Sequence, residues 1–147
     1  MRTSGQGSSH QPRGRKGAMP SLLYVDDEET IGRAVIRWFE RRGYVAHVAR
    51  SIEEAKKVLL ANEPDTIFVD VWLGTESGFE LMGWIEDVLP HLADRVTFVT
   101  GELADSLGGA HRVWQTLGRP VLQKPFDLAQ LEAHAGTVVD AQRRSGA

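Results

Sequence analysis

The feature that most constrains the fold is a series of short apolar runs, each of which leads directly into a polar or charged residue. A short unbroken apolar run is typical of a strand buried on both faces of a parallel sheet. Because a charge is costly to bury inside such a strand, we expect each polar residue at the strand's carboxyl end, where open α/β sheets bind their ligands. Four runs show this pattern: residues 22–25 before Asp26 and Asp27, residues 66–69 before Asp70, residues 96–99 before Thr100, and residues 121–123 before Lys124.

Segments with helical spacing of apolar residues separate these runs and indicate the fold class. Ser51 and Glu54 form a capping-box pattern, and Asp127 is placed to cap a last helix. Region 102–118 has helical spacing but two adjacent glycines in its middle, so we expect an interrupted helix there. With a further strand at residues 44–48, five strands alternate with five helices. This pattern predicts an α/β, flavodoxin-like (βα)5 three-layer sandwich with a five-stranded parallel sheet of order 2-1-3-4-5.

In that strand order the polar residues meet at one edge of the sheet. Strands one and three are neighbours, so Asp26, Asp27 and Asp70 would lie within a few ångströms of one another. Three carboxylates so close repel, and a divalent cation relieves the repulsion. Oxygen ligands without histidine or cysteine favour Mg²⁺ or Mn²⁺ over zinc. Thr100 and Lys124 supply a hydroxyl and an ammonium suited to phosphoryl oxygens, and Asp70 can be the nucleophile that forms an aspartyl phosphate.

These segments, in this order, resemble the receiver domain of two-component response regulators over about residues 22–143. The run 119–126 is similar to the corresponding motif of receivers attached to hybrid sensor kinases. The resemblance rests on four segments: VDDE at 25–28, FVD at 68–70 with SG at 77–78, FVTG at 98–101, and LQKPF at 122–126.

The resemblance implies a phosphoacceptor and a metal site. Asp70 would accept a phosphoryl group from a phosphohistidine of a histidine kinase or a histidine phosphotransfer protein. The metal would be Mg²⁺, with Mn²⁺ as a substitute, bound directly by Asp27, Asp70 and the backbone carbonyl of Trp72. Asp26 would act on the ion through a water molecule.

The resemblance also implies a conformational switch on phosphorylation. At one position of this switch the chain differs from the usual residue of the family. Lys124 would contact the phosphoryl group, its peptide bond to Pro125 would be cis, and Thr100 would move toward the phosphate. The family usually carries Tyr or Phe three residues before the lysine, whereas this chain has Val121. The coupled swing of a hydroxyl and an aromatic ring therefore cannot occur here.

Trp72 and Glu102 occupy positions where the family tunes the lifetime of the aspartyl phosphate. We expect Trp72 to shield the phosphate from water and to lengthen its life. The alternative, a tryptophan that simply packs on a neighbouring loop, stays open.

Composition limits the setting of the domain. The absence of cysteine excludes disulfides, thiolate metal sites and a cysteine nucleophile. Since no run is long enough to cross a bilayer, we expect a cytoplasmic protein without a membrane partner. Residues 1–19 are basic and rich in small polar residues, and we interpret them as a disordered tail before a receiver domain at 20–143 and a loose end at 144–147. The acidic balance of the folded part argues against nucleic acid as a partner.

We therefore expect a stand-alone receiver that signals through protein contact and is not a conventional turnover enzyme, with its last two helices as a candidate homodimer surface. The rival hypothesis is a receiver-like adaptor that works unphosphorylated, for which a partner indifferent to Mg²⁺ and to Asp70→Asn would be diagnostic. A flavodoxin-type cofactor protein would need a phosphate-binding loop where this chain has carboxylates. A phosphatase with an aspartyl intermediate would need a DxD pattern on the first strand, which this chain lacks.

Overall fold

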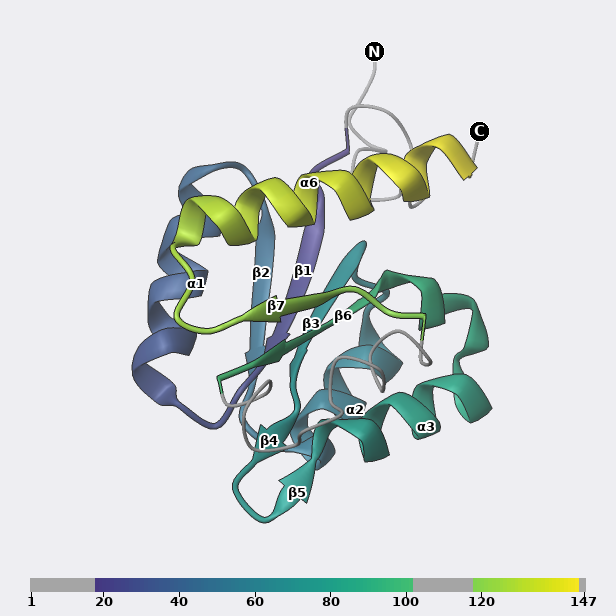
Figure 1. Ribbon diagram of the computed structural model, residues 1–147. Helices are drawn as coiled ribbons and strands as arrows, with labels where there is room; N and C mark the ends of the chain where they lie inside the picture. The colour runs from purple at the N-terminus through teal and green to yellow at the C-terminus, as the bar shows by residue number, and fades with distance from the viewer. Residues whose placement is uncertain (1–17, 102–117, 146–147) are drawn as a thin grey trace.

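A five-stranded parallel sheet lies at the centre of the computed structural model, which describes residues 18–101 and 118–145 (Figure 1). Its order is β2-β1-β3-β6-β7, with a separate two-stranded hairpin, β4-β5, beyond the end of β3. Counted without the hairpin, this is the predicted order 2-1-3-4-5, which is confirmed. The strands are β1 (Ser21–Val25), β2 (Val45–Ala49), β3 (Thr66–Asp70), β4 (Trp72–Leu73), β5 (Glu76–Ser77), β6 (Val96–Thr100) and β7 (Val121–Gln123).

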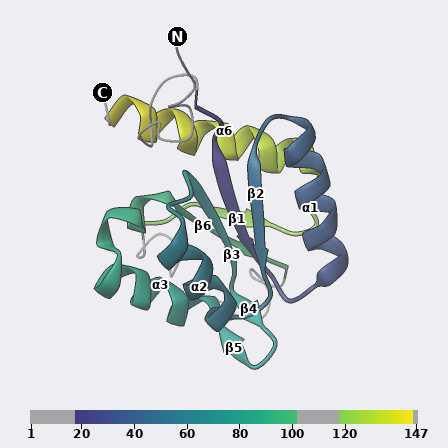
Figure 2. The same ribbon diagram turned by 180° about the vertical axis from the view of Figure 1, so that it is seen from behind.

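Helices cover both faces of the sheet, because successive side chains of each buried strand point to opposite faces. Leu22 and Tyr24 of β1 belong to the core beneath α1 and α6, whereas Leu23 and Val25 belong to the core beneath α2 and α3. The view from behind shows α2 and α3 side by side on the second face (Figure 2). The helices are α1 (Glu29–Arg41), α2 (Ile52–Ala61), α3 (Gly78–Val88), the short 3₁₀ helix η2 (Pro90–Arg95) and α6 (Leu128–Ser145).

Two helix starts follow the predicted capping chemistry. The Ser51 hydroxyl accepts a hydrogen bond from the Glu54 N–H at 3.2 Å, while the Glu54 carboxylate accepts one from the Arg50 N–H at 2.8 Å. At the start of α6 the exchange is reciprocal: Asp127 accepts from the Gln130 N–H at 2.7 Å, and the Gln130 side chain accepts from the Asp127 N–H at 2.9 Å. These bonds satisfy N–H groups that a helix start otherwise leaves open.

The structure adds detail that the sequence did not indicate. Residues 71–77, expected as a loop, contain the hairpin β4-β5. The last helix continues to Ser145 and so includes two residues that the sequence analysis placed in a loose end. The interrupted helix expected within 102–118 falls almost wholly on residues 102–117, outside the described residues. No described helix is long and apolar enough to cross a membrane.

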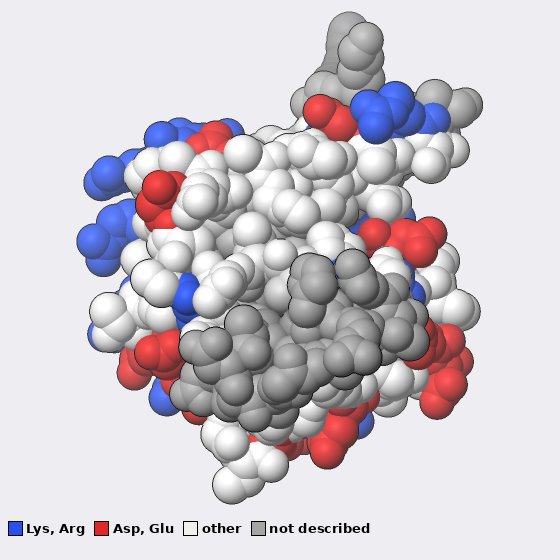
Figure 3. Space-filling view, viewed as in Figure 1, with Lys and Arg blue, Asp and Glu red and all other residues white. Residues whose placement is uncertain are grey.

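Basic side chains gather at two places on the face shown in Figure 3, over α1 and near the C-terminal end of α6. The exposed arginines of α1 include Arg33, Arg37 and Arg41. Few charged side chains lie between these two places, so the described residues form no continuous basic strip on this face.

Candidate functional site

Three carboxylates meet at the carboxyl edge of the sheet. Asp26 and Asp27 follow β1, and Asp70 ends the neighbouring strand β3, which pairs with β1 in parallel register. One oxygen of each of the three residues lies within 4.8 Å of one oxygen of the others. The predicted proximity is therefore present, and it follows from the register of two adjacent strands that end at the same level.

Asp26 is fully buried, and each of its oxygens has a partner. Oδ2 accepts a hydrogen bond from the Tyr24 hydroxyl at 2.9 Å and lies 2.9 Å from Lys124 Nζ, while Oδ1 accepts from the Glu28 N–H at 3.0 Å. Burial, together with the negative charge of Asp26, raises the pKa of Tyr24 far above its usual value. The Tyr24 hydroxyl therefore stays protonated and donates to Asp26, which compensates part of the cost of burying the charge.

Asp70 is held between a backbone donor and an ammonium group. Its side chain accepts a hydrogen bond from the Trp72 N–H at 3.1 Å and another from Lys124 Nζ at 2.9 Å. Burial raises the pKa of Asp70 to about 6; the bonds from Lys124 and Trp72 oppose the rise, and the charge of Asp26 adds to it. At neutral pH Asp70 is ionised, although burial and the nearby charge of Asp26 disfavour its charged form. A cation that binds beside it, or a reaction that removes its charge, is therefore favoured.

A glycine at the start of α3 lets the chain pass close behind Asp70. A Cβ on Gly78 would overlap the backbone carbonyl oxygen of Asp70. The Gly78 N–H also donates to the carbonyl oxygen of Val71 at 2.8 Å, which closes the hairpin segment against the end of β3. The fold thus fixes the position of Asp70 through its backbone as well as through its side chain.

Lys124 faces the acidic group from the opposite side, directly after β7. Its Nζ lies 2.9 Å from Asp26, 2.9 Å from Asp70 and 2.8 Å from Glu28, and its side chain is 15% exposed. Burial alone would lower the pKa of Lys124, but the hydrogen bonds to the three carboxylates outweigh burial and raise it above the usual value. Lys124 is therefore a permanent positive charge at the site, and its peptide bond to Pro125 is cis, as the resemblance implied.

Thr100 ends β6 beside this group, and its hydroxyl has no hydrogen-bond partner among the described residues. The residue is fully buried, and Oγ1 makes no hydrogen bond to any described residue. A buried polar group without a partner costs about 1–3 kcal/mol. A ligand oxygen that accepted a hydrogen bond from this hydroxyl would remove that cost.

The donor set fits a hard divalent cation. Three carboxylates without a histidine or cysteine among them are the ligands of Mg²⁺, Mn²⁺ or Ca²⁺ rather than of zinc. Asp27 is exposed, whereas Asp26 and Asp70 are buried and each of their oxygens contacts a protein donor. Asp27 is therefore the carboxylate most open to an ion.

The remaining predicted residues lie around this centre. The Trp72 side chain is 47% exposed next to Asp70, so it is not a core residue. Val121 is partly buried, packs against the core beneath α2 and α3, and pairs with Phe98 of β6. Glu102 lies outside the described residues.

Two contributors were missed by the sequence analysis. Tyr24 is noted there only as part of an apolar run, and Glu28 only as part of the segment 25–28 that carries the family resemblance. The signal for Tyr24 was its position two residues before Asp26, which puts both side chains on the same face of an extended segment. Contact between Glu28 and Lys124 depends on side-chain reach across the edge of the sheet, for which the sequence carries no signal.

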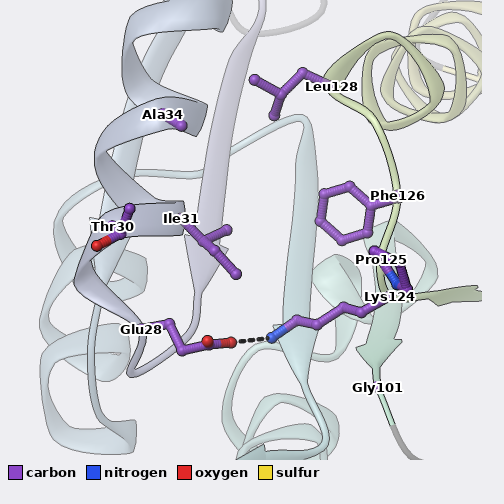
Figure 4. Close-up of a pocket in the computed structure, with 9 residues that line it drawn as sticks. All are labelled: Glu28, Thr30, Ile31, Ala34, Gly101, Lys124, Pro125, Phe126 and Leu128. Atoms are coloured by element: carbon purple, nitrogen blue, oxygen red, sulfur yellow. Dashed lines mark hydrogen bonds and ion pairs between the residues drawn. The ribbon is translucent and has the colours of Figure 1, made fainter.

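A cavity of about 510 Å³ opens next to the site, between the start of α1 and the segment that joins β7 to α6 (Figure 4). Ile31, Phe126 and Leu128 point into it. The Lys124 side chain reaches from the end of β7 toward Glu28, and the ion pair between them closes one end of the cavity.

Comparisons with known proteins agree with this geometry. The model of the response regulator receiver domain family matches residues 22–135. The transcriptional regulatory protein YvrH of Bacillus subtilis is 46% identical over 116 residues, which is 77% of this chain and 46% of that protein. The sensor kinase CckA of Brucella abortus is 27% identical over 124 residues, 83% of this chain but 13% of that protein. The chain spans less than two thirds of the length of the curated relatives it matches.

Solved structures show the same fold. A CheY-like receiver domain protein from Methanospirillum hungatei has a TM-score of 0.74 at 21% identity, covering 86% of this chain and 98% of that one. A response regulator from Burkholderia pseudomallei has a TM-score of 0.66 at 29% identity, covering 87% of this chain and 73% of that one. That structure contains a phosphorylated aspartic acid and a calcium ion.

Proposed function

Because the chain belongs to the response regulator receiver domain family, we propose that Asp70 is its phosphoacceptor and receives a phosphoryl group from the phosphohistidine of a histidine kinase or a histidine phosphotransfer protein. The observation that carries the proposal is the contact between Asp70 and Lys124 at 2.9 Å, within a group of three carboxylates. A phosphoryl acceptor needs both an ionised nucleophile and a nearby cation, and this pair supplies them.

The residues have separate tasks in the transfer. An oxygen of the Asp70 carboxylate forms a bond to phosphorus while the phosphorus–nitrogen bond of the phosphohistidine breaks, and the imidazole leaves with the bonding pair and takes up a proton. Lys124 offsets negative charge on the phosphoryl oxygens. The Thr100 hydroxyl donates a hydrogen bond to one of those oxygens. When bound, Mg²⁺ would offset the negative charge that the transfer concentrates at this edge of the sheet.

The family to which the chain belongs supports one division of the metal ligands. We assign direct coordination to Asp27, Asp70 and the backbone carbonyl of Trp72, with Mn²⁺ as a substitute for Mg²⁺. Asp26 would act through a water molecule, since it is fully buried and its Oδ2 already contacts both Tyr24 and Lys124. The response regulator structure from Burkholderia pseudomallei contains a calcium ion, which supports a hard divalent cation as the ligand of this family.

The proposal also covers the lifetime of the aspartyl phosphate and the way in which the phosphorylated domain signals. We assign control of phosphate lifetime to Trp72 and Glu102, and the half-exposure of Trp72, whose backbone N–H donates to Asp70, supports its part. The switch involves Thr100 and Val121, which end and begin two paired strands. The output is protein contact in the cytoplasm, with a homodimer through the last two helices as one form of it. The domain promotes its own phosphorylation and dephosphorylation and does not turn over a separate substrate.

A phosphotransfer profile tests the proposal. Candidate kinases, labelled with radioactive ATP, are mixed with wild-type protein, with Asp70→Asn, and with Asp87→Asn as a control at an exposed aspartate of α3. We expect Mg²⁺-dependent transfer to the wild type and to Asp87→Asn, and none to Asp70→Asn. Labelling that persists in Asp70→Asn would move the acceptor elsewhere. A binding partner indifferent to both Mg²⁺ and Asp70→Asn would instead favour the phosphorylation-independent adaptor.

A further inference from the structure

Glu28 contacts the site lysine but differs from the other two carboxylates that do so. Its Oε1 lies 2.8 Å from Lys124 Nζ, and its side chain is 58% exposed. The side chains of Asp26 and Asp70 are 0% and 7% exposed. Glu28 precedes the first residue of α1, yet its side chain makes no capping hydrogen bond to that helix. Its carboxylate is therefore directed to the lysine rather than to the helix start (Figure 4).

The three contacts use the full donor capacity of the lysine. An ammonium group has three N–H donors, and here each of three carboxylates lies within 2.9 Å of Nζ. A phosphoryl group on Asp70 would bring new oxygens that also need a donor. Lys124 can serve them only if one of its present partners gives way.

Glu28 is the partner that leaves at the lowest cost. Asp26 is fully buried and is also bonded to Tyr24, and Asp70 carries the phosphoryl group itself. A carboxylate that is more than half exposed is solvated by water as soon as it separates from the lysine, and such ion pairs contribute little free energy. Separation of a buried carboxylate would instead leave an uncompensated charge.

We propose that Glu28 is a positioning residue that holds Lys124 in the unphosphorylated protein and yields its place on Nζ to a phosphoryl oxygen. This inference rests on the proposed function, because it requires a phosphoryl group on Asp70. In this role Glu28 opposes phosphorylation, since its contact must be lost before Lys124 can serve the phosphoryl oxygens. Neutralising Glu28 therefore strengthens the binding of a phosphoryl group.

The test measures binding of beryllofluoride, a phosphoryl mimic, to the whole chain in the presence of Mg²⁺ by calorimetry. The variants are Glu28→Gln and, as a matched control, Glu29→Gln. Glu29 is the next residue and is also exposed, but it pairs with Arg33 and Arg50 rather than with Lys124. Both variants remove one negative charge and its ion pairs near the start of α1, but only Glu28→Gln removes an ion pair with Lys124.

We expect Glu28→Gln to bind beryllofluoride about two- to fivefold more tightly than the wild type, the size that loss of a largely exposed ion pair allows. Glu29→Gln should bind within about twofold of the wild type, and the gain in Glu28→Gln should shrink at high salt as the ion pair is screened. Mg²⁺ affinity without beryllofluoride should change equally little in both variants, because neither glutamate is a proposed ligand.

Two outcomes would overturn the inference: equal affinities for Glu28→Gln and Glu29→Gln, or weaker binding by Glu28→Gln than by the wild type. A thermal melt of each variant identifies a loss of folding, and Glu28→Asp, with a carboxylate on a shorter side chain, then provides the second comparison. In Glu28→Asp the reach to Lys124 is reduced while the charge is kept, so tighter binding is again expected. A wild-type protein that binds no beryllofluoride would contradict the proposed function itself, which separates the two failures.

Discussion

Two buried aspartates lie at opposite ends of the central strand β3, and their surroundings differ. Asp65, just before the strand, is 4% exposed, and Asp70, at its end, is 5% exposed. Asp65 accepts hydrogen bonds from the Ser21 N–H at 2.8 Å and from the Ser21 hydroxyl at 3.4 Å. Asp70 instead shares one lysine with Asp26 and lies close to Asp27. Asp65 joins two strands at the amino edge of the sheet, whereas Asp70 belongs to a group of like charges at the carboxyl edge.

The comparison shows that burial of a carboxylate does not by itself indicate a functional site. At the amino edge, hydrogen bonds between neighbouring strands satisfy the buried charge, and the result is a structural link. At the carboxyl edge, three carboxylates, two of which share one lysine, repel one another, and the Thr100 hydroxyl has no acceptor among the residues that the structure describes. This combination of mutually repelling carboxylates and a buried hydroxyl without a described acceptor indicates a functional site.

The largest effect on stability is expected at the amino edge. Asp65→Ala removes the buried carboxylate that accepts from the Ser21 N–H and hydroxyl, and we expect the free energy of unfolding to fall by about 1–3 kcal/mol. Urea denaturation followed by circular dichroism measures this change. Asp87→Ala, at an exposed position of α3, should stay within about 0.5 kcal/mol of the wild type. A loss below about 1 kcal/mol for Asp65→Ala would mean that the two edges differ less than we conclude.

Metal binding should stabilise the carboxyl edge. A ligand that binds only the folded state at about one hundred times its dissociation constant adds about 2.7 kcal/mol. We therefore expect saturating Mg²⁺ to raise the melting temperature of the wild type, and to raise that of Asp27→Asn much less, because Asp27 is a proposed ligand. An equal rise in both proteins would place the ion elsewhere.

Removal of charge at Asp70 should stabilise the metal-free protein. The pKa of Asp70 is raised from 3.8 to about 6, so the folded protein holds this proton more tightly than the unfolded chain does. The resulting penalty grows as the pH rises from about 4 to about 6 and is fully present at pH 7. We expect Asp70→Asn to be more stable than the wild type by about 1–2 kcal/mol at neutral pH and to lose this advantage near pH 4. Denaturation of both proteins at the two pH values in EDTA measures the difference in their free energies of unfolding. If Asp70→Asn is less stable than the wild type at neutral pH, the expectation is refuted.

A histidine away from both edges should have the smallest effect. His134 of α6 lies 3.0 Å from the Thr97 hydroxyl of β6, and burial lowers its pKa. The unfolded chain therefore binds a proton that the folded protein resists, and this part of the stability is lost as the pH falls below about 6.5. In the Asp70→Asn background, where Asp70 no longer titrates, His134→Gln should lose less stability than its parent between about pH 7.5 and about pH 5.5.

The control for this experiment is His91→Gln, because the His91 side chain is half exposed and pairs with Glu63. This variant removes a histidine at an exposed position, so its comparison with His134→Gln isolates the effect of the buried position. If His134→Gln and His91→Gln show the same dependence as the parent, the environment of His134 does not contribute to acid sensitivity.

The sequence predicted the sheet and its functional edge because both depend on short-range patterns. Each buried strand is an unbroken apolar run, and a polar residue at its end can lie only at the edge of the sheet. Strand order then followed from right-handed crossovers. For the same reason Asp26, Asp27 and Asp70 could be placed together before any coordinates, and the structure has them within 4.8 Å.

The rest depends on features that no local pattern encodes. The hairpin β4-β5 has strands of two residues, too short for any periodicity. The contact between Glu28 and Lys124 spans 96 positions and depends on how far two side chains reach. That the Thr100 hydroxyl has no partner within residues 18–101 and 118–145 is a property of packing, because an identical residue at another strand end could have found a backbone acceptor.

Mass spectrometry of the site tests the central claim most directly. The protein is treated with phosphoramidate in Mg²⁺ or in EDTA, the acyl phosphate is trapped by reduction with borohydride, and the modified residue is identified by peptide sequencing. We predict modification of Asp70 alone, only in Mg²⁺, and none in Asp70→Asn. Modification of Asp26, Asp27 or Asp65 in place of Asp70, or equal modification of Asp70 in EDTA, would contradict the account.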